Sequence, residues 1–334
     1  MKYCILGDTH LGASNADEFH ANNQRQFFKY LYKTLENIGV YNIIQTGDFF
    51  DDRKHIKHPT IQLANELIND KFKYHIIIGN HDMYYKNSIT PNSVNEVLSK
   101  FDNITVYNKM GSIDGIDLVP WICDENHDSI MSSIKASKNK YCIGHFELIG
   151  FDYYKNNTAT HGYERDFLNN YERVFSGHYH TRSENKNITY VGTPYTLNTN
   201  DANDIRGFYI FDSDTGAYEF IENPVIHHVR YNVDDNIPTG NRNVNLIVDA
   251  LDTVDKKEIS AIIEQHTKTY NNVNVKIKKH DAVNESRVEY NQNISISDIM
   301  YEHVDKDTTL LKSDKESIKM LLREYEAQLW KNVV

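Results

Sequence analysis

The chain has 334 residues, enough for one large domain with a small one or for two domains of ordinary size. Hydrophobic residues make up 40% of it and no apolar run approaches the roughly 20 residues of a membrane helix, which excludes a membrane-spanning protein. The formal net charge of -11 argues against a protein that coats nucleic acid by general electrostatics, although bound cations or a basic partner can reverse the sign locally. MKYCILGDTH, at the N-terminus, is too short in apolar residues for a signal peptide, so we expect a cytoplasmic location.

Short β-type runs with helical stretches between them fill the first 220 residues and indicate an α/β fold that becomes richer in strands toward residue 220. One helix is predicted over 23–39, because apolar residues recur on one face and Gly39 ends the pattern. The predicted strands lie at 2–6, 41–46, 73–78, 116–121, 141–144, 173–177, 188–192 and 207–211.

A second, smaller region follows residue 224. Turn-rich residues 234–243 precede a strand, helix and strand pattern, so we expect a small α+β domain over 225–280, after a first domain over 1–224. Residues 281–293 are polar and have no periodicity, which is typical of a linker. Residues 294–334 are expected to be helical, with an amphipathic stripe formed by Ile318, Leu321, Leu322, Tyr325 and Leu329.

Five of the apolar runs end in a glycine, and side chains able to bind a metal follow each of these glycines within one to three residues. In α/β sheets ligands bind beyond the carboxyl ends of the strands, so these side chains are expected to converge on one cleft. Each short motif alone is most often a turn or a satisfied polar contact, but five at corresponding positions indicate a metal site. The residues are Asp8, His10, Asp48, Asn80, His81, His145, His178 and His180.

The ligand types narrow the choice of metal. Carboxylate, imidazole and amide groups without thiolate favour Mn, Fe or Zn over Cu(I) or iron–sulfur clusters. More ligands are present than one tetrahedral ion needs, so we expect two ions, a pair suited to phosphoester hydrolysis because it offsets charge on the attacked and leaving oxygens. Asp48 is the candidate for the bridging residue, since a carboxylate can span two metals and an imidazole cannot.

These motifs resemble a known family. GDTH, GDFFD, GNHD, GHFE and GHYH, spread over residues 7–180, match the calcineurin-like metallophosphoesterase pattern in order. Within it, GHYHTRSENKNITYVGTPYTL resembles SbcD-type nucleases of the Mre-eleven family, the phage recombination nucleases above all. The resemblance implies a four-layer αββα sandwich with a small α+β capping domain and C-terminal helices.

The resemblance also implies roles for individual residues. One ion is expected on Asp8, His10, Asp48 and His180, and the other on Asp48, Asn80, His145 and His178. His81 is expected beside the scissile phosphate as a proton donor or charge stabiliser, against the alternative of a hydrogen-bonded turn residue. Mn²⁺ is the expected metal, with Mg²⁺, Fe²⁺ or Zn²⁺ as alternatives. The chain departs from many cellular relatives at Asp51, where they carry a histidine linked to exonuclease action.

Partners are implied as well: DNA, and an SbcC-like SMC-type ATPase gripped by the C-terminal helices, with the nuclease as a homodimer in a heterotetramer and no membrane. A helix that packs on its own domain is the alternative for the 318–329 stripe. If the chain is phage-encoded, its place is the cytoplasm of the bacterial host. Arg53, Lys54 and Lys57, in the loop after Asp48, are candidate contacts to the DNA backbone or else members of a solvated loop.

The sequence therefore predicts a two-metal DNA nuclease subunit, an exonuclease or endonuclease that acts with an ATPase in recombination and double-strand break repair. A small-molecule phosphodiesterase or phosphatase on the same scaffold is the main alternative. GDFFDDRK lacks the continuation typical of protein phosphatases, and small phosphodiesters do not require the downstream segments. An inactive scaffold is less consistent with the chain, because no expected ligand is missing.

Overall fold

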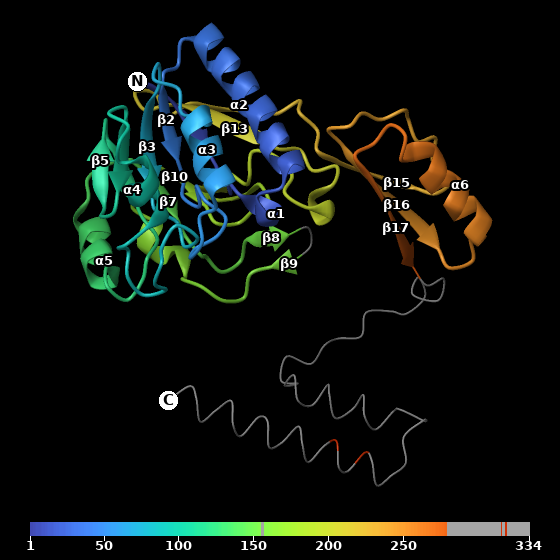
Figure 1. Ribbon diagram of the computed structural model, residues 1–334. Coiled ribbons are helices and arrows are strands. Elements are labelled where there is room, and N and C mark those ends of the chain that lie inside the picture. Colours follow the sequence, from blue (N-terminus) through green and yellow to red (C-terminus); the bar gives the residue numbers. More distant parts are fainter. Residues whose placement is uncertain (155–156, 279–314, 316–317, 319–334) are drawn as a thin grey trace. The chain divides into compact units, whose positions relative to one another are not determined.

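Two six-stranded sheets form the centre of the computed structural model, which describes residues 1–154, 157–278, 315 and 318 (Figure 1). The first sheet has the order β14-β13-β1-β2-β3-β4 and the second has the order β11-β12-β10-β7-β6-β5. The strands of the first sheet are β1 (Lys2–Leu6), β2 (Asn42–Gln45), β3 (Lys73–Ile77), β4 (Ile104–Tyr107), β13 (Gly207–Asp212) and β14 (Tyr218–Glu222). Those of the second are β5 (Gly111–Ile113), β6 (Ile116–Val119), β7 (Tyr141–His145), β10 (Arg173–Gly177), β11 (Ser183–Asn185) and β12 (Ile188–Tyr190).

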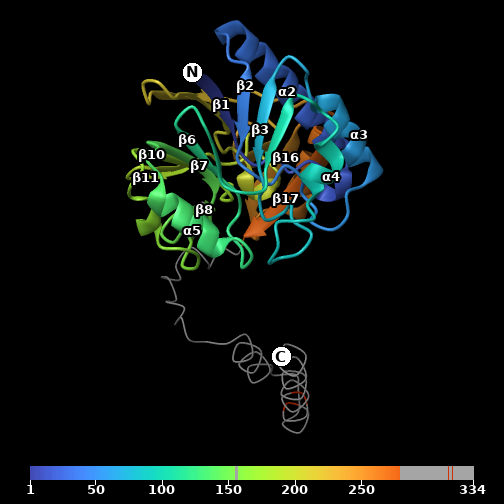
Figure 2. The ribbon, with the colours of Figure 1, turned by 90° about the vertical axis from the view of Figure 1, so that its left-hand side faces the viewer.

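Helices cover the outer faces of both sheets. Figure 2 shows α2 and α3 on one side, α5 on the other, and the sheets between them. A short two-stranded sheet, β8 (Asp152–Tyr154) with β9 (Asn157–Thr158), and two 3₁₀ turns, η1 (Arg165–Leu168) and η2 (Thr199–Asp201), lie in the connections. The helices of this region are α1 (Ala13–Ala16), α2 (Glu18–Ile38), α3 (His58–Leu67), α4 (Ser93–Leu98) and α5 (His127–Ala136).

Three apolar layers hold these elements together. Phe27 and Leu31 of α2 pack with Ile43 of the first sheet in one layer. Side chains of both sheets, including Ile44 and Phe175, fill the layer between them. The third layer joins α5 to the second sheet. The order helix, sheet, sheet, helix confirms the predicted αββα sandwich.

The long helix α2 shows how local sequence sets these elements. The Asp17 side chain accepts a hydrogen bond from the His20 backbone N–H at 2.8 Å, and this N-cap starts the helix five residues before the predicted position. At the other end Gly39 has a φ of 70° and donates its N–H to the Glu36 carbonyl, as the sequence predicts. Helix α2 covers the first sheet, and its Gln24 side chain donates a hydrogen bond to the Thr9 carbonyl in the loop after β1.

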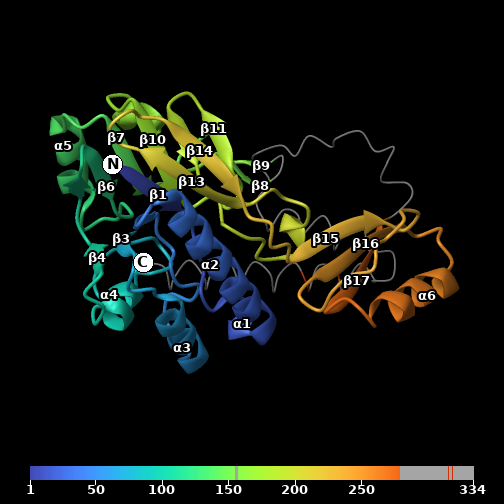
Figure 3. The ribbon, with the colours of Figure 1, turned by 90° about the horizontal axis from the view of Figure 1, so that it is seen from above.

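A smaller sheet follows the sandwich, with the parallel order β15 (His228–Asn232), β16 (Asn245–Leu251) and β17 (Asn272–Lys278), and with α6 (Lys256–His266) between the last two strands. Figure 3 shows this sheet and α6 beside the sandwich. Arg230 donates to the Thr199 carbonyl at 2.7 Å and ties the small sheet to η2. Residues Met1–Lys278 form one compact unit, and the division at residue 224 stays a prediction.

Some predictions lie outside the described residues. These are the linker at 281–293, most of the helical segment at 294–334, and Leu321, Leu322, Tyr325 and Leu329 of the stripe. Ile318 is described and is helical.

Candidate metal centre

The candidate ligands lie at the carboxyl ends of neighbouring parallel strands. Asp8 and His10 follow β1, Asp48 follows β2, and Asn80 follows β3, and these strands are adjacent in the first sheet. In the second sheet, His145 ends β7, and His178 and His180 follow its parallel neighbour β10. Because the two sheets face each other, their strand ends bring both sets of side chains to one edge of the sandwich.

The turns that hold these side chains adopt uncommon backbone conformations. Asp48, His10 and His178 have φ values of 51°, 43° and 89°, in the left-handed region that costs non-glycine residues about 1–3 kcal/mol. Glycines allow the loops to approach one another closely. A Cβ at Gly79 would lie 2.2 Å from Asp48 Oδ1, and one at Gly177 would lie 2.3 Å from Asp8 Oδ1. The two carboxylates are therefore held against bare backbone.

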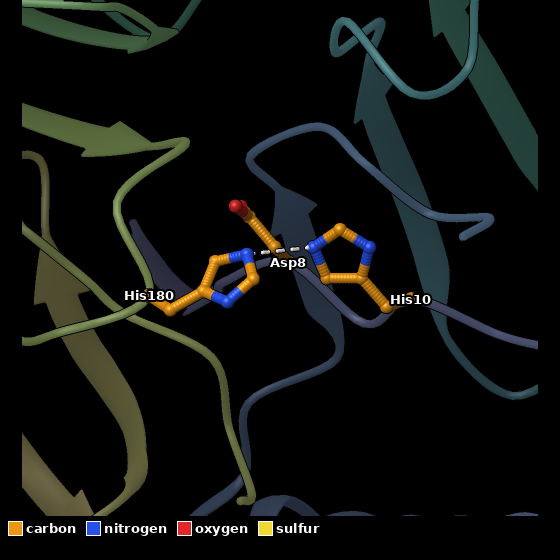
Figure 4. A group of neighbouring side chains, drawn as sticks. All are labelled: Asp8, His10 and His180. Carbon is orange, nitrogen blue, oxygen red and sulfur yellow. Dashed lines mark hydrogen bonds between the residues drawn. The ribbon is translucent and has the colours of Figure 1, made fainter. Parts of the chain in front are cut away.

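One group of ligands consists of Asp8, His10 and His180, whose donor atoms all lie within 4.8 Å of one another. Figure 4 shows the imidazole rings of His10 and His180 facing each other, with the Asp8 carboxylate beside them. Their Nε2 atoms are 3.1 Å apart. Asp8 and His10 come from the loop after β1 and His180 from the distant loop after β10, and Asp8 and His10 are almost completely buried.

A second group consists of Asp48, His145 and His178, whose donor atoms also lie within 4.8 Å of one another. The Asn80 amide oxygen lies 3.0 Å from His145 Nε2 and 3.0 Å from His178 Nδ1. Asp48 stands between the two groups, because its Oδ2 is 3.4 Å from His145 Nε2 and 4.0 Å from His10 Nε2. The structure thus brings together all seven of the side chains predicted as ligands.

The carboxylate and imidazole groups of the site are arranged in a way that suits a divalent cation. His145 Nδ1 lies 2.8 Å from the Thr46 carbonyl and donates its proton there, so a neutral His145 directs the Nε2 lone pair at the Asn80 and Asp48 oxygens. Lone pairs that face one another at such distances repel unless a proton or a cation lies between them. Ligand atoms about 2.0–2.2 Å from a shared ion lie roughly 3 Å apart, the spacing found here.

Electrostatics set the protonation of these groups. Burial opposes a charge on His145, but the carboxylates of Asp48 and Asp8 outweigh burial and raise its pKa to about 9. Burial also acts against the Asp48 carboxylate, yet His145, His81 and His10 together lower the pKa of Asp48. Burial, and then His10, lower the pKa of His180 well below its usual value. At neutral pH His180 therefore offers a lone pair, while a proton and a cation compete for His145.

His81 lies next to both groups. Its backbone N–H donates to Asp48 Oδ1 at 2.7 Å, and its ring packs edge-on against that of His10 with centroids 5.1 Å apart. Its Nδ1 donates to the Asp51 carbonyl at 2.6 Å. The remaining ring nitrogen, Nε2, is then the atom available for proton transfer.

Three residues that were not predicted to support the site contact its ligands or the loops that carry them. The buried Asp82 carboxylate accepts the N–H groups of Gly79 and Phe50 at 2.9 and 3.1 Å and joins the loops after β3 and β2. Burial, and then Asp48, raise the pKa of Asp82 to about 7. Asp51 Oδ1 lies 3.2 Å from His10 Nδ1, and the Arg206 guanidinium donates to the His180 carbonyl.

A signal for two of these residues was present in the motifs. Asp82 is the last residue of GNHD, and Asp51 the last residue of GDFFD. Arg206 lies outside every motif, so that only the fold reveals it.

The candidate DNA contacts lie in the loop between β2 and α3. Arg53 is half-buried, and Lys54 and Lys57 are exposed. Lys57 Nζ donates to the Asn15 carbonyl at 3.2 Å and lines, with Asp51, a cavity of about 200 Å³. The loop therefore adjoins the two ligand groups, and its contact with DNA stays a prediction.

Comparisons with known proteins agree with this geometry. The family model described as calcineurin-like phosphoesterase matches residues 1–182, and the chain belongs to that family. Exonuclease subunit 1 of Enterobacteria phage T4 is 36% identical over 343 residues, a match that covers 99% of this chain and 98% of that protein. This relative confirms the resemblance to phage nucleases, and the family confirms that the chain is a metal-dependent phosphoesterase.

Two solved structures are also similar. An archaeal phosphodiesterase has a TM-score of 0.33 at 14% identity, with 66% of this chain and 99% of that chain covered. GAP50, the anchor in the inner membrane complex of Plasmodium, has a TM-score of 0.42 at 12% identity, with 67% and 89% covered. Within the described residues, every helix is too short or too polar to cross a membrane.

Proposed function

We propose that this chain is the nuclease subunit of a complex and hydrolyses the phosphodiester bonds of DNA with two divalent ions. The observation that carries the proposal is the position of Asp48 between two ligand groups, each able to hold an ion. The T4 relative, named an exonuclease subunit and matched over nearly its full length, supports DNA as the substrate. The competing substrate is a small phosphodiester.

Each ligand has a role in this proposal. Asp8, His10, Asp48 and His180 hold one ion, while Asp48, Asn80, His145 and His178 hold the other. When bound, such a pair supplies a Lewis acid for the phosphate and lowers the pKa of water, which attacks phosphorus as the bond to the leaving oxygen breaks. Mn²⁺ is the metal we expect, because imidazole and carboxylate ligands are mixed in both groups.

The chain's own residues orient the reaction. Asn80 and His145 fix the position of Asp48 and His178 through contacts of 3.0 to 3.4 Å. His81 is held by Asp48 and by the Asp51 carbonyl, which leaves Nε2 as the ring nitrogen that would face the reacting phosphate. In the doubly protonated imidazolium form it gives its Nε2 proton to the leaving oxygen, or stabilises the negative charge that develops there, and keeps its Nδ1 proton on the Asp51 carbonyl.

The remaining roles concern partners. The word subunit in the name of the T4 relative supports a second protein in the complex, and we propose an SMC-type ATPase of the SbcC kind. The segment that includes Ile318 would bind it, and two nuclease chains would form the centre of a heterotetramer. The small sheet β15–β17 would act as the capping domain beside the DNA, in the cytoplasm of the bacterial host.

A cleavage assay tests the function. End-labelled duplex DNA, single-stranded DNA and bis(p-nitrophenyl) phosphate are offered to the purified chain in Mn²⁺, Mg²⁺ or Zn²⁺, with and without the ATPase. We expect DNA degradation that requires Mn²⁺, is lost in Asp48→Asn and persists in Asp52→Asn, a matched charge change in an exposed residue. Turnover of the small ester with DNA intact even in the presence of the ATPase would instead identify a small-molecule phosphodiesterase.

A further inference from the structure

Asp51 contacts two histidines of the site through two different groups. Its carboxylate oxygen Oδ1 lies 3.2 Å from His10 Nδ1, and its backbone carbonyl accepts the hydrogen bond of His81 Nδ1 at 2.6 Å. With His10 and His81 it forms a third set of donors that lie within 4.8 Å of one another. One residue thus meets the Nδ1 atom of both rings.

The backbone around Asp51 is held by the loop that carries His10. His10 N–H donates to the Asp48 carbonyl at 3.0 Å, Leu11 N–H to the Phe49 carbonyl at 2.9 Å, and Asp51 N–H to the Leu11 carbonyl at 3.1 Å. This short ladder fixes the carbonyl that receives His81. It also places the side chain of residue 51 alongside the ring of His10, and a substitution at this position does not change that placement.

The His10 ring depends on the protein for its proton acceptor. Its side chain is 2% exposed, so water cannot serve Nδ1. The N–H is not well aligned with Oδ1, but the Asp51 side chain is 36% exposed and can turn toward it. A proton on Nδ1 leaves the Nε2 lone pair directed at the first ligand group, where His180 Nε2 lies 3.1 Å away.

We infer that Asp51 is a positioning residue: its carboxylate keeps His10 in the tautomer whose Nε2 can bind a cation, and its carbonyl keeps His81 in the same tautomer. The inference rests on the proposed role of His10 as a ligand. A group that accepts a hydrogen bond from the non-ligating ring N–H of a metal-bound histidine fixes the tautomer and orientation of that ring. Loss of such a group typically weakens metal binding about 10–100-fold.

The two contacts can be separated, because substitution changes the side chain and keeps the carbonyl. Asp51→Ala removes the acceptor for His10, whereas Asp51→Asn keeps an oxygen acceptor and removes the charge. Asp52→Asn is the matched control, since the Asp52 carboxylate is exposed and, among the contacts described, meets only the backbone N–H groups of Lys54 and His55 and, at 3.8 Å, the exposed ring of His55. In all three variants the carbonyl of residue 51 still faces His81.

The tautomers are measured by NMR on the metal-free full chain with ¹⁵N-labelled histidine, with assignments from His10→Gln and His81→Gln. Mn²⁺ affinity is measured separately by electron paramagnetic resonance of the free ion. In the wild type we expect both rings protonated at Nδ1. Asp51→Ala should give a mixture of tautomers for His10 alone and bind Mn²⁺ about 10–100-fold more weakly. Asp51→Asn should fall between Asp51→Ala and the wild type, and Asp52→Asn should match the wild type.

The inference is overturned if Asp51→Ala leaves the His10 tautomer and the Mn²⁺ affinity unchanged, or if His81 changes with His10. Failure of the proposed function looks different, because a wild-type chain that binds no Mn²⁺ contradicts the ligand assignment whatever the tautomers are. Asp51→Asn guards against misfolding, since it preserves the size and the acceptor of the side chain.

Discussion

The edge of the sandwich and the small sheet β15–β17 both bury acidic groups, but they neutralise them differently. In the small sheet, the buried Asp249 is met by Lys278 at 2.9 Å and by Arg230 at 3.6 Å. At the sandwich edge, the groups that face Asp8 and Asp48 include imidazoles that themselves offer lone pairs. Lysine and arginine balance the first set permanently, whereas the imidazoles that face the second set can exchange a proton for a metal ion. In this chain the acids paired with permanent cations stabilise the fold, and the acids that face imidazoles are the candidate metal ligands.

The sharpest test of this comparison is His81→Gln, which alters the reaction and keeps the ligands. Loss of a proton donor of this kind lowers rates by roughly 10²–10⁴-fold. We expect such a fall in DNA cleavage with unchanged Mn²⁺ affinity, measured by single-turnover assays and metal titration. His55→Gln, at an exposed position in the neighbouring loop, should cleave normally. Full activity in His81→Gln would remove His81 from the mechanism.

The small sheet should respond to a loss of packing and not to a loss of chemistry. Leu246 is fully buried in β16, so Leu246→Ala should lower the free energy of unfolding by about 2–5 kcal/mol. Mn²⁺ affinity should stay constant, because the candidate ligands come from the other sheets. Leu251→Ala, at the exposed end of the same strand, is the matched control. Urea unfolding and metal titration measure both quantities, and a parallel loss of Mn²⁺ binding would contradict the separation.

Acid should lower the free energy of unfolding through His227, directly before β15, and His228, at the start of β15, which both contact Thr196 of the sandwich. Burial lowers the pKa of His227 to about 3 and that of His228 to about 4. A histidine in the unfolded chain has a pKa of about 6.5, which is higher than both of these folded-state values. The unfolded state therefore binds protons first as the pH falls. Stability is thus complete above pH 6.5, and each histidine removes up to about 1.4 kcal/mol per pH unit below it, down to its folded pKa.

The measurement is the unfolding free energy between pH 8 and pH 5 for the wild type and for the double variant His227→Gln, His228→Gln. The variant should have the flatter profile over this range. Identical slopes would show that the two histidines are not buried in the neutral form.

The smallest effect is expected at the basic loop. Arg53→Ala with Lys54→Ala should weaken DNA binding modestly and lower the slope of log affinity against log salt by roughly 1 for each phosphate that the loop no longer neutralises. Lys71→Ala, whose ammonium pairs with Glu36 on the surface, is the control. A slope equal to that of the wild type would show that Arg53 and Lys54 do not contact DNA and belong to a solvated loop.

Much of the sandwich could be predicted, because its central strands are buried on both faces and read as apolar runs. The strand predicted at 173–177 is β10 itself, and that at 2–6 is β1. Two of the edge strands, β11 and β14, were missed because they lack such runs. β11 is Ser183–Asn185, a polar segment, and β14 is half-exposed along its length. In these strands hydrogen bonds to a neighbour, rather than local pattern, decide the structure.

The candidate ligands could be predicted because parallel strands share one end and glycine punctuates each of them. Their supporting contacts could not. The approach of Asp51 to His10 joins loops that follow two different strands, and the approach of Arg206 to the His180 carbonyl joins the loop after β10 to the residue before β13. Such contacts follow from the register of the sheets, which no short motif encodes.

Two glycines described above bear on how this protein tolerates mutation. Gly79 and Gly177 have no reactive side chain, yet the carboxylates of Asp48 and Asp8 press against them at distances that leave no room for a methyl group. A saturation mutagenesis screen should therefore find these two positions as intolerant as the acids themselves. In any attempt to evolve a new substrate range, these two glycines should be kept because they hold the candidate ligands in place, while the longer connections between strands are the places to introduce diversity.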